Sequence, residues 1–426
     1  MESHDSKIII VGAGVFGLST ALWLSRAGYK DITVFDRCPL DTKHYNPSDG
    51  CDGASADINK IFRTAYGTEK EYQNLAIEAR KLWLSWNQEI SESPASDLPL
   101  GLAPDDKVLD LCGNFFLAEG PELRQFYKDS LSVMEKLEPE CRKLQFVKGD
   151  KDDEERLRQI DPKWVETFHA IDGINNNNTN GFLDIQGGVT LADKACIYAR
   201  FLCEKAGVRF VLGSPQGQLK TLIVANEGNG KQVTGIQTYD GKSHHGDIVI
   251  VACGGWTASV IPEAARTVET TAGTLMFIDV PKERKDIWDK FDSKHFPAWS
   301  YRRGEGDEYY QGGGGSLETS QPEAGASSWL RYIWLTLVDV QFPITKEGRL
   351  KFGFRGRKPL PICELLIEPG IDEQVLTVCT SRVSTPKTKY THDPIKTVPL
   401  YGLQLVKEVI GKAFPELAEF GFTDFR

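Results

Sequence analysis

The segment that decides the fold spans residues 7–36 and reads KIIIVGAGVFGLSTALWLSRAGYKDITVFD. Its apolar run at residues 8–11 predicts a first buried strand, and residues 32–35 predict a second. The intervening residues 16–26 predict a helix. Strand, glycine-rich turn, helix and strand in this order form a complete βαβ unit of the dinucleotide-binding kind.

Three glycines, Gly12, Gly14 and Gly17, stand between the first strand and the helix. They supply the tight turn, the close backbone approach to a pyrophosphate and the close packing of helix on strand. The helix directs its N-terminal amides and the positive end of its dipole at the same pyrophosphate. The alternative is a glycine-rich turn in an unrelated α/β protein. The nucleotide site is favoured because the strand, turn, helix, second strand and terminal acid all occur in the expected order and spacing.

The second strand ends on Asp36, whose carboxylate can accept hydrogen bonds from both ribose hydroxyls of a nucleotide. The same negative charge argues against NADP, because it would repel a 2′-phosphate. The sequence therefore predicts a cofactor with an unphosphorylated ADP half.

Length and charge limit the partners of this chain. With 426 residues, 40% of them hydrophobic, it can bury one large core or two adjoining ones. A net charge of −10 argues against nucleic acid or an anionic membrane as partner, because phosphates would be repelled. No stretch approaches the apolar length of a membrane span, and the N-terminus enters the first strand without the features of a signal peptide.

The nine cysteines are scattered without a Cys-x-x-Cys pair, and the seven histidines lack metal-ligand spacing. We therefore expect a reducing compartment, no disulfide framework and no metal. The C-terminal residues do not form a peroxisomal address.

A second set of elements fits the same cofactor site. Residues 187–194 open a helix that runs to Lys205, and a strand follows at residues 208–212. Another apolar strand begins at Asp247 and runs into Gly254, Gly255 and Trp256. This is either a buried strand that ends in a turn or a second close backbone approach beneath the cofactor; its order along the chain favours the second interpretation.

The remaining pattern suggests a cover over that site. Residues 270–399 show short strands separated by turn residues, typical of an antiparallel sheet that roofs a pocket. Residues 400–414 predict an amphipathic helix stopped by Pro415. A further helix is expected to place one apolar face inward, formed by Tyr72, Leu75, Ala76, Ala79, Leu82, Trp83 and Trp86.

Taken together, the blocks at residues 12–36, 54–67, 187–194, 251–256 and 383–402 resemble one family. The chain is similar to the FAD-dependent amine oxidases of the D-amino-acid-oxidase superfamily. Within it the likeness is to the branch of monomeric sarcosine, pipecolate, saccharopine and fructosyl-amino-acid oxidases, in its fungal form. The resemblance covers nearly the whole chain.

The resemblance implies an α/β fold in which a Rossmann-type FAD-binding domain is interleaved with an antiparallel-sheet substrate domain. The expected division is 1–90 and 181–265 for the FAD-binding domain, 91–180 and 266–400 for the substrate domain, and 401–426 for the start of a final FAD-domain segment. The resemblance also implies oxidation of a secondary-amine amino acid (N-methyl, cyclic imino, saccharopine-like or glycated) to an imine, with reduction of O2 to H2O2. A monomer in the cytoplasm or the peroxisome is expected.

Two cations of the resembling blocks have expected roles. Arg63 matches the arginine that pairs with the substrate carboxylate, a role that suits the bidentate guanidinium; the alternative is an arginine that pairs with a nearby carboxylate of the protein. Lys60 lies three residues earlier and, with Arg63, would form an anion-attracting mouth. The family also uses a lysine to activate oxygen. Lys285 and Lys290 are both candidates for it, against the alternative that they are solvated surface lysines; Lys285 is the one we assign to the catalytic set.

The expected cofactor contacts are those that the nucleotide motifs and the resemblance assign to FAD: Gly12, Gly14, Val15, Phe16, Gly17, Asp36, Arg37, Ser55, Lys60, Val208, Gly254 and Trp256.

The sequence departs from the family pattern in two places. It stops at Arg426, before the family's flavin-linking cysteine, a final strand and a second carboxylate-binding lysine, so we expect a C-terminally truncated chain with non-covalent flavin. Residues 312–341, which begin with a run of glycines, and residues 359–379 are atypical in composition. A translated intron or another error in the gene prediction is the hypothesis for both segments.

Three functions compete on these grounds. The first is an FAD-dependent amine oxidase of primary metabolism, or a tailoring oxidase of secondary metabolism. The second is a truncated or wrongly predicted paralogue that binds nucleotide without turnover. The third, a nicotinamide dehydrogenase, is disfavoured because the second Gly-Gly strand and the block with Lys60 and Arg63 suit a flavin better.

Overall fold

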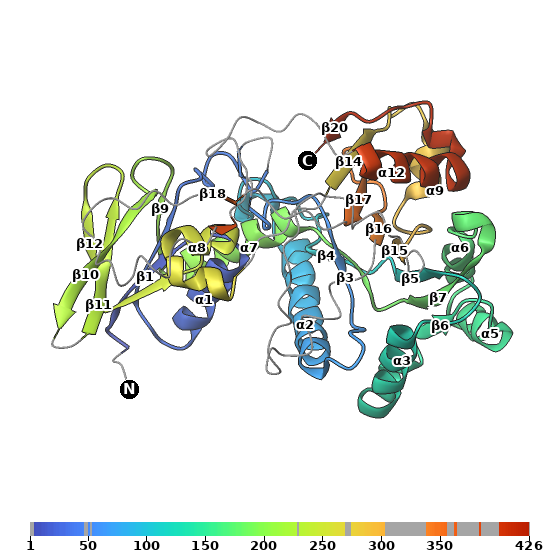
Figure 1. The fold of residues 1–426 in the computed structure, drawn as a ribbon, viewed down its shortest axis with the longest axis horizontal. Coiled ribbons are helices and arrows are strands. Elements are labelled where there is room, and N and C mark those ends of the chain that lie inside the picture. Colours follow the sequence, from blue (N-terminus) through green and yellow to red (C-terminus); the bar gives the residue numbers. More distant parts are fainter. Residues whose placement is uncertain are drawn as a thin grey trace.

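The computed structural model describes residues 4–46, 50–51, 53–227, 230–268, 274–302, 338–355, 362–363, 383–384 and 400–425. Figure 1 shows two lobes on either side of the long helix α2 (Lys70–Glu92). One lobe, the nucleotide lobe, is built on a parallel sheet near the N-terminus, and the other, the substrate lobe, on a large mixed sheet. The chain passes between the lobes more than once, so the expected interleaved α/β fold is confirmed.

The parallel sheet has the strand order β13-β1-β2-β9, and all its neighbours run parallel. Its strands are β1 (Lys7–Val11), β2 (Asp31–Asp36), β9 (Arg209–Leu212) and β13 (Ile248–Val251). The central strands are continuous apolar runs because both of their faces are covered.

Alternate residues of β1 face two different cores. Ile8 and Ile10 pack with α1 (Val15–Arg26), α7 (Ala192–Lys205) and the C-terminal half of α2. Ile9 and Val11 pack on the opposite face with Ile236 of an antiparallel sheet. That sheet consists of β10 (Leu219–Glu227), β11 (Gly230–Thr238) and β12 (Ser243–His245). Because side chains alternate between the two faces of β1, one strand supplies apolar residues to both the helical layer and the antiparallel sheet.

The mixed sheet of the substrate lobe has the order β20-β14-β17-β16-β15-β5-β7-β6. Its neighbours are antiparallel except for the pair β15 and β5. The strands are β5 (Asn114–Glu119), β6 (Gln145–Val147), β7 (Thr179–Asp184), β14 (Thr274–Asp279), β15 (Ala298–Arg302), β16 (Val338–Gln341), β17 (Arg349–Arg355) and β20 (Asp424–Phe425).

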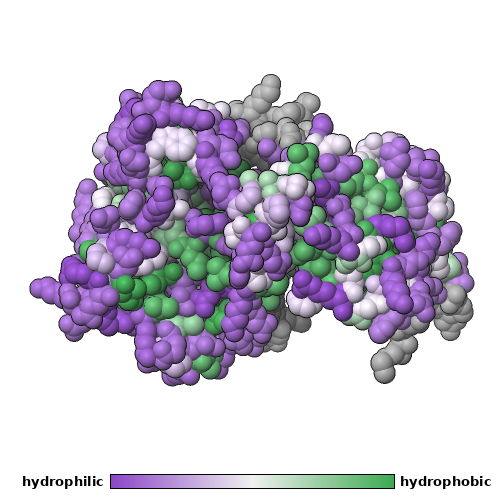
Figure 2. Space-filling model, turned by 180° about the vertical axis from the view of Figure 1, so that it is seen from behind, coloured by the Kyte–Doolittle hydropathy of each residue, from purple (hydrophilic) through white to green (hydrophobic). Residues whose placement is uncertain are grey.

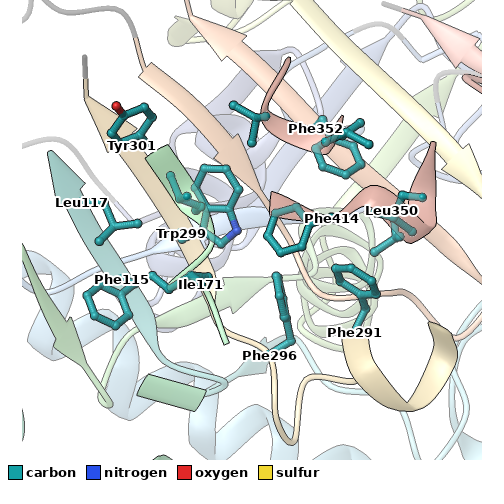
Figure 3. Close-up of a cluster of buried hydrophobic side chains, with 14 of the residues drawn as sticks. Phe115, Leu117, Ile171, Phe291, Phe296, Trp299, Tyr301, Leu350, Phe352 and Phe414 are labelled. Carbon is teal, nitrogen blue, oxygen red and sulfur yellow. The ribbon is translucent and has the colours of Figure 1, made fainter. Parts of the chain in front are cut away.

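Four helices enclose the largest apolar core of this sheet: α5 (Lys151–Ile160), α6 (Lys163–His169), α9 (Lys285–Phe291) and α12 (Leu400–Ala413). The helix α3 (Gln125–Leu137) packs in a separate apolar cluster with Phe116 and Phe182, and the short helix α4 (Pro139–Arg142) follows it. In Figure 3 the rings of Phe291, Phe296, Phe414 and Trp299 point toward one another. Phe291 and Phe296 have ring centroids 4.8 Å apart, and Trp299 stacks on Phe414 at 6.3 Å. These contacts attach the C-terminal helix firmly to the substrate lobe.

A small antiparallel sheet stands between the two large ones and carries part of the candidate site. It consists of β3 (Lys60–Phe62), β8 (Gly188–Thr190) and β4 (Leu109–Asp110). Short segments complete the fold: η2 (Ala95–Asp97), η3 (Ile174–Asn177), η4 (Gly254–Trp256), α8 (Thr257–Val260), η5 (Pro262–Arg266), η7 (Pro415–Leu417), and the pair β18 (Ile362–Cys363) and β19 (Val383–Ser384).

Seen from behind, the surface is mostly hydrophilic, with hydrophobic residues gathered in patches on both lobes (Figure 2). Within the described part of the chain, no helix is long and apolar enough to cross a membrane.

The buried face of α2 differs from the expected one. Trp86 is buried as expected, but Tyr72 and Leu75 are 48% and 63% exposed. Ala76 is buried as expected, but its buried companions in the N-terminal half are Gln73 and Ile77, which were not expected on this face. The reason is tertiary: Gln73 Nε2 contacts the sulfur of Met134 on α3 at 3.7 Å, so this half of the helix packs on the substrate lobe.

The C-terminal residues also lie elsewhere than expected. The helix expected at residues 400–414 is confirmed as α12, and Pro415 follows directly. However, α12 and β20 pack in the substrate lobe, where β20 pairs with β14. The structure thus places residues 400–425 with the mixed sheet, whereas we expected residues 401–426 to begin a segment of the FAD-binding domain.

Most of the segment at residues 312–341 lies outside the described residues, as does most of residues 359–379 and 383–402. The last four residues of the first segment, Val338–Gln341, form β16 between β15 and β17. Gln341 Oε1 also accepts a hydrogen bond of 3.1 Å from the buried Trp299 indole. This end of the segment is therefore an integral strand of the sheet.

Candidate functional site

The glycine turn after β1 touches the end of β13. Gly12 has a φ of +106°, and a Cβ built there would lie 2.3 Å from the carbonyl oxygen of Ala252. A Cβ on Gly17 would lie 1.8 Å from the carbonyl oxygen of Gly12. Both positions therefore admit only glycine, and the two glycine-containing segments predicted to share one cofactor lie against each other.

The N-terminus of α1 opens onto this turn. Gly14 is its N-cap in extended conformation, and the first turn, which is fully described, carries no acidic side chain. The amide of Val15 donates a 2.8 Å hydrogen bond to Ser55 Oγ. Phe16 is 73% exposed beside it. The arrangement suits a phosphate, because helix amides and a serine hydroxyl can converge on one anion.

Asp36 lies at the carboxyl end of β2, beside the turn. Its Oδ2 accepts a 2.7 Å hydrogen bond from the Ala13 amide, and its Oδ1 accepts one of 2.8 Å from the Cys38 amide. Burial raises the pKa of Asp36 above its ordinary value, and the two amide donors oppose that rise. The amides fix the carboxylate at the edge where a ribose would lie.

The segment after β13 supplies an aromatic wall. The Arg37 guanidinium lies over the Trp256 ring, with Cζ 4.4 Å from the ring centroid. The indole nitrogen of Trp256 is buried and has no hydrogen-bond acceptor among the described residues. Gly254 in the same turn has a φ of +53°. Together with Gly12 and Asp36, these groups fit the ADP half of a dinucleotide.

Val208 differs from the other expected cofactor contacts. Its side chain is buried in the core with α7, and its amide donates a 3.0 Å hydrogen bond to the carbonyl of Cys203. Its contact with a cofactor stays a prediction.

We predict that Gly17→Ala lowers the FAD affinity of the purified chain by roughly 5- to 150-fold. The added methyl group meets a backbone carbonyl that holds the turn, and such overpacking costs about 1–3 kcal/mol. Titration of apoprotein with FAD, followed by flavin fluorescence, measures the effect. The control is Gly411→Ala in α12, where a Cβ meets nothing within 4 Å. Unchanged affinity in the Gly17 variant would contradict the role of this turn.

A carboxylate bridges two lysines just before β3. Asp57 accepts from Lys60 Nζ at 3.0 Å through one oxygen and from Lys351 Nζ at 2.6 Å through the other. Lys351 also donates to the carbonyl of Asn59 at 2.7 Å. Burial by itself raises the pKa of Asp57, but the two lysines outweigh it and hold that pKa below its ordinary value.

Lys351 is not among the residues predicted from the sequence. Its side chain, on the central strand β17, is 2% exposed, whereas Lys60 is half-exposed. Leu350, Phe352 and Phe354 flank it on the same strand and are buried. A lysine inside an otherwise apolar strand is a usable signal, because lysine is almost never fully buried without a partner.

Arg63 follows β3 and faces the substrate lobe. It is half-buried, and its Cζ lies 4.6 Å from the centroid of the Tyr66 ring. Tyr66 in turn stacks on Tyr72 of α2 at 5.7 Å. The aromatic support limits the positions of the guanidinium, as binding of a planar carboxylate requires.

The residue after Arg63 anchors this segment. Thr64 is fully buried and donates a 2.6 Å hydrogen bond to Asp184 Oδ2 at the end of β7. Asp184 also accepts from Gln145 Nε2 at 3.2 Å and from the Gln186 amide at 3.0 Å. Burial raises the pKa of Asp184, and the Thr64 hydroxyl acts most strongly against that rise.

Thr64→Val is predicted to destabilise the protein by about 1–3 kcal/mol at neutral pH, because the buried Asp184 carboxylate loses its shortest hydrogen bond. The variant raises the pKa of Asp184 further, so the deficit shrinks as the pH falls and the carboxyl takes up a proton. Urea unfolding at several pH values measures both effects. The control is Thr42→Val at an exposed threonine. Equal losses of unfolding free energy in the two variants would contradict a stabilising hydrogen bond between Thr64 and Asp184.

The structure brings Lys60 together with Asp57 and Lys351, but it places the expected oxygen-activating lysines elsewhere. Lys285 begins α9 and is exposed. Lys290 lies in the last turn of the same helix and pairs with Glu416 at 2.5 Å. Figure 1 shows α9 in the outer part of the substrate lobe, next to α12. A role for Lys285 in oxygen chemistry stays a prediction.

In the described ranges, no group of three or more His, Cys, Asp or Glu side chains could hold a metal ion.

The curated proteins similar to this chain are named as oxidases of saccharopine or of sarcosine. L-saccharopine oxidase of Schizosaccharomyces pombe is 24% identical over 256 residues, which cover 58% of this chain and 51% of that protein. Monomeric sarcosine oxidase of an Arthrobacter species is 34% identical over 85 residues, 20% of each protein. The chain thus spans about half the length of the first relative and a fifth of the second.

Solved structures share the fold. Fructosyl peptide oxidase from E. terrenum has a TM-score of 0.68 at 19% identity, over 100% of this chain and 78% of that one. Fructosamine oxidase (Amadoriase II) from Aspergillus fumigatus has a TM-score of 0.65 at 18% identity, over 100% of this chain and 76% of that one. The profile of the family described as FAD dependent oxidoreductase (DAO) matches residues 7–346. That match extends over well more than half of the chain, and the protein therefore belongs to the DAO family of FAD-dependent oxidoreductases.

Proposed function

We propose that this protein oxidises a secondary-amine amino acid to its imine and passes the two electrons to O2, forming H2O2. The amine loses a hydride from carbon and a proton from nitrogen, and water then hydrolyses the imine. The single observation that carries the proposal is a physical connection: Ser55 contacts the N-terminus of α1, and eight residues later Arg63 faces the substrate lobe. The nucleotide cradle and the candidate carboxylate-binding cation are thus joined by one short segment.

The residues present fit FAD at its ADP half. Gly12, Gly14 and Gly17 would admit the pyrophosphate, Asp36 would accept the ribose hydroxyls, and Trp256 would wall the site. When bound, the flavin supplies the hydride acceptor and the site of reaction with O2.

Two cations would perform the remaining work. Arg63 would bind the substrate carboxylate bidentately and thereby orient the neighbouring carbon and nitrogen. Lys351 would place a positive charge in a dry site, where it stabilises the negative charge that dioxygen acquires on reduction. Its hydrogen bonds to Asp57 and to the Asn59 carbonyl hold the ammonium in one position. Lys285 is the competing residue for this role.

The relatives support the same class of substrate. Their names specify sarcosine, saccharopine and fructosyl peptides, and the first two are amino acids with a secondary amine. The shared chemistry is oxidation next to nitrogen in a molecule that carries a carboxylate. The matched region covers about half of the saccharopine oxidase. The activity of this chain must therefore be measured on the chain itself.

The test is a flavin spectrum of the purified chain after incubation with FAD. Under anaerobic conditions we expect N-methyl amino acids, pipecolate, saccharopine or fructosyl amino acids to bleach the flavin, and air to restore the colour with release of H2O2. A colourless, inert protein would instead support the nucleotide-binding paralogue without turnover. Acid precipitation is expected to leave the flavin in solution, and a yellow precipitate would show covalent attachment.

A further inference from the structure

Two buried cysteines stand at the two ends of one loop beside the candidate ADP site. Cys38 follows β2 and Arg37, and Cys51 comes shortly before Ser55. The two residues are 6% and 9% exposed, and both belong to the apolar core around α1 and α7. Both thiols are free. The proposed reaction gives neither of them a role.

The ends of this loop lie against each other. The Cys38 thiol donates a 3.9 Å hydrogen bond to the carbonyl oxygen of Gly50, the residue directly before Cys51. That oxygen shares one planar peptide unit with the nitrogen and Cα of Cys51, so the Cys38 sulfur lies beside the Cys51 backbone. The Cys51 amide donates at 3.2 Å to the carbonyl of Asn46, which turns the end of the loop back on itself. The two cysteines are therefore neighbours in space.

The surroundings of the pair divide its protons unequally. A hydrogen bond from the Cys51 thiol lowers the pKa of Cys38 against the opposing effects of burial and of Asp36, and the charge of Arg37 lowers it further. The same hydrogen bond, together with burial, raises the pKa of Cys51. A thiolate next to a protonated thiol is the arrangement of a peroxide-reactive cysteine with its resolving partner.

The loop between the two cysteines also positions the ribose-binding carboxylate. The Cys38 amide donates a 2.8 Å hydrogen bond to Asp36 Oδ1. Tyr45, inside the loop, is 1% exposed, and its hydroxyl donates at 2.8 Å to the carbonyl of Ala13. The amide of Ala13 donates in turn to Asp36 Oδ2 at 2.7 Å. A change in the spacing of the two cysteines therefore reaches Asp36 by two routes.

We propose that Cys38 and Cys51 form a peroxide-sensitive pair, whose oxidation to a disulfide weakens the binding of FAD. A disulfide bond of about 2.05 Å is far shorter than a contact between two thiols and demands its own dihedral angle, so the loop must shift when the bond forms. The shift displaces the donors that fix Asp36. Hydrogen peroxide is the product of the proposed reaction, so that cofactor retention would respond to turnover.

The oxidation takes place in two balanced steps. The Cys38 thiolate attacks hydrogen peroxide, the O–O bond breaks, and Cys38 becomes a sulfenic acid; the departing hydroxide takes up the proton that the thiol had released and forms water. The Cys51 sulfur then attacks the Cys38 sulfur, the S–O bond breaks, and the oxygen leaves as a second water. Two thiols thus lose two electrons and two protons in total, and one peroxide is reduced.

The test adds hydrogen peroxide directly to the purified chain, so that it does not depend on turnover. After removal of peroxide with catalase and alkylation of the remaining thiols, mass spectrometry of a digest is expected to show peptides joined through Cys38 and Cys51, and dithiothreitol should separate them. Titration with FAD, followed by flavin fluorescence, should give a dissociation constant roughly 5- to 150-fold higher for the cross-linked form, the usual range of coupling between two sites. Alkylation of both cysteines after peroxide treatment, or unchanged FAD affinity in the cross-linked form, would overturn the proposal.

A serine variant assigns the effect to the pair. In Cys51→Ser the hydroxyl can still donate a hydrogen bond to Cys38, but it forms no disulfide. Before treatment this variant should bind FAD as the wild-type protein does, and peroxide should leave its affinity unchanged. The control is Cys141→Ser at a half-buried thiol of α4, which should respond to peroxide as the wild-type protein does. An equal loss of FAD affinity in peroxide-treated Cys51→Ser would contradict the proposal.

Turnover is measured in the same preparations, so that two failures can be told apart. Oxidation of amines by a chain in which peroxide leaves Cys38 and Cys51 unlinked would refute the inference and leave the proposed function standing. A cross-link that weakens FAD binding, in a chain that oxidises no amine, would support the inference and count against the proposed function.

Discussion

Replacement of Lys351 by methionine should slow the reaction of the reduced flavin with O2 by roughly 100- to 1,000-fold, the usual cost of removing one preorganised group that stabilises developing negative charge. The lysine is 2% exposed and held by two hydrogen bonds, so no water would replace its charge efficiently. Reduction of the flavin by amine should change far less, because that half of the reaction has no oxygen anion to stabilise. Stopped-flow absorbance, with anaerobic reduction and reoxidation measured separately, gives both rates.

Two further variants make the Lys351 experiment specific. Lys346→Met removes an exposed lysine that pairs with Asp105 at 2.8 Å, and it should leave reoxidation unchanged. Lys285→Met tests the competing assignment: slow reoxidation in this variant, with normal reoxidation in Lys351→Met, would transfer the role to α9. The methionine at 351 also lets the pKa of Asp57 return toward its ordinary value, so a Lys351→Met/Asp57→Asn double variant checks that an uncompensated carboxylate is not the cause.

Arg63→Met should lower kcat/KM for amino-acid amines by roughly 30- to 5,000-fold, which corresponds to the loss of about 2–5 kcal/mol when one partner of a buried charge pair is removed. Most of the effect is expected in KM, because the carboxylate is bound in the ground state as well as in the transition state. Arg63→Lys should recover only part of the loss, because an ammonium lacks the bidentate fork.

The substrate carboxylate provides the decisive comparison for Arg63. The wild-type protein should prefer a free amino-acid amine over its methyl ester, and Arg63→Met should abolish that preference. Tyr66→Leu, which removes the ring beneath the guanidinium, controls for lost packing. A variant that retains the full preference for the free acid would exclude Arg63 as the carboxylate-binding residue.

The nucleotide lobe could be predicted from sequence because its signals are local. Residues 7–36 contain two strands, a turn, a helix and the terminal Asp36, all within one short stretch, and β1, α1 and β2 appear where expected. Glycine spacing is informative for the same reason, since contacts such as that between Gly17 and the Gly12 carbonyl lie within a single turn of chain.

Lys351 could not be found in this way. The contact of Lys351 with Asp57 joins residues 294 positions apart and depends on the register of β17 in the mixed sheet. Arg302 approaches Phe126 only because β15 pairs in parallel with β5. The exposed Tyr72 has a similar cause: helical periodicity defines a stripe on α2, but packing between two lobes decides which part of it is buried.

The hydrogen bond between Ser55 and the Val15 amide has a thermodynamic consequence. An occupied pyrophosphate site would order Ser55, and with it the segment that leads to Asp57 and Arg63. If bound FAD raises the affinity for an amino-acid amine by some factor, the bound amine must raise the affinity for FAD by the same factor, because coupling between two binding equilibria is reciprocal. Cofactor retention during purification therefore becomes a reporter of ligands in the substrate lobe.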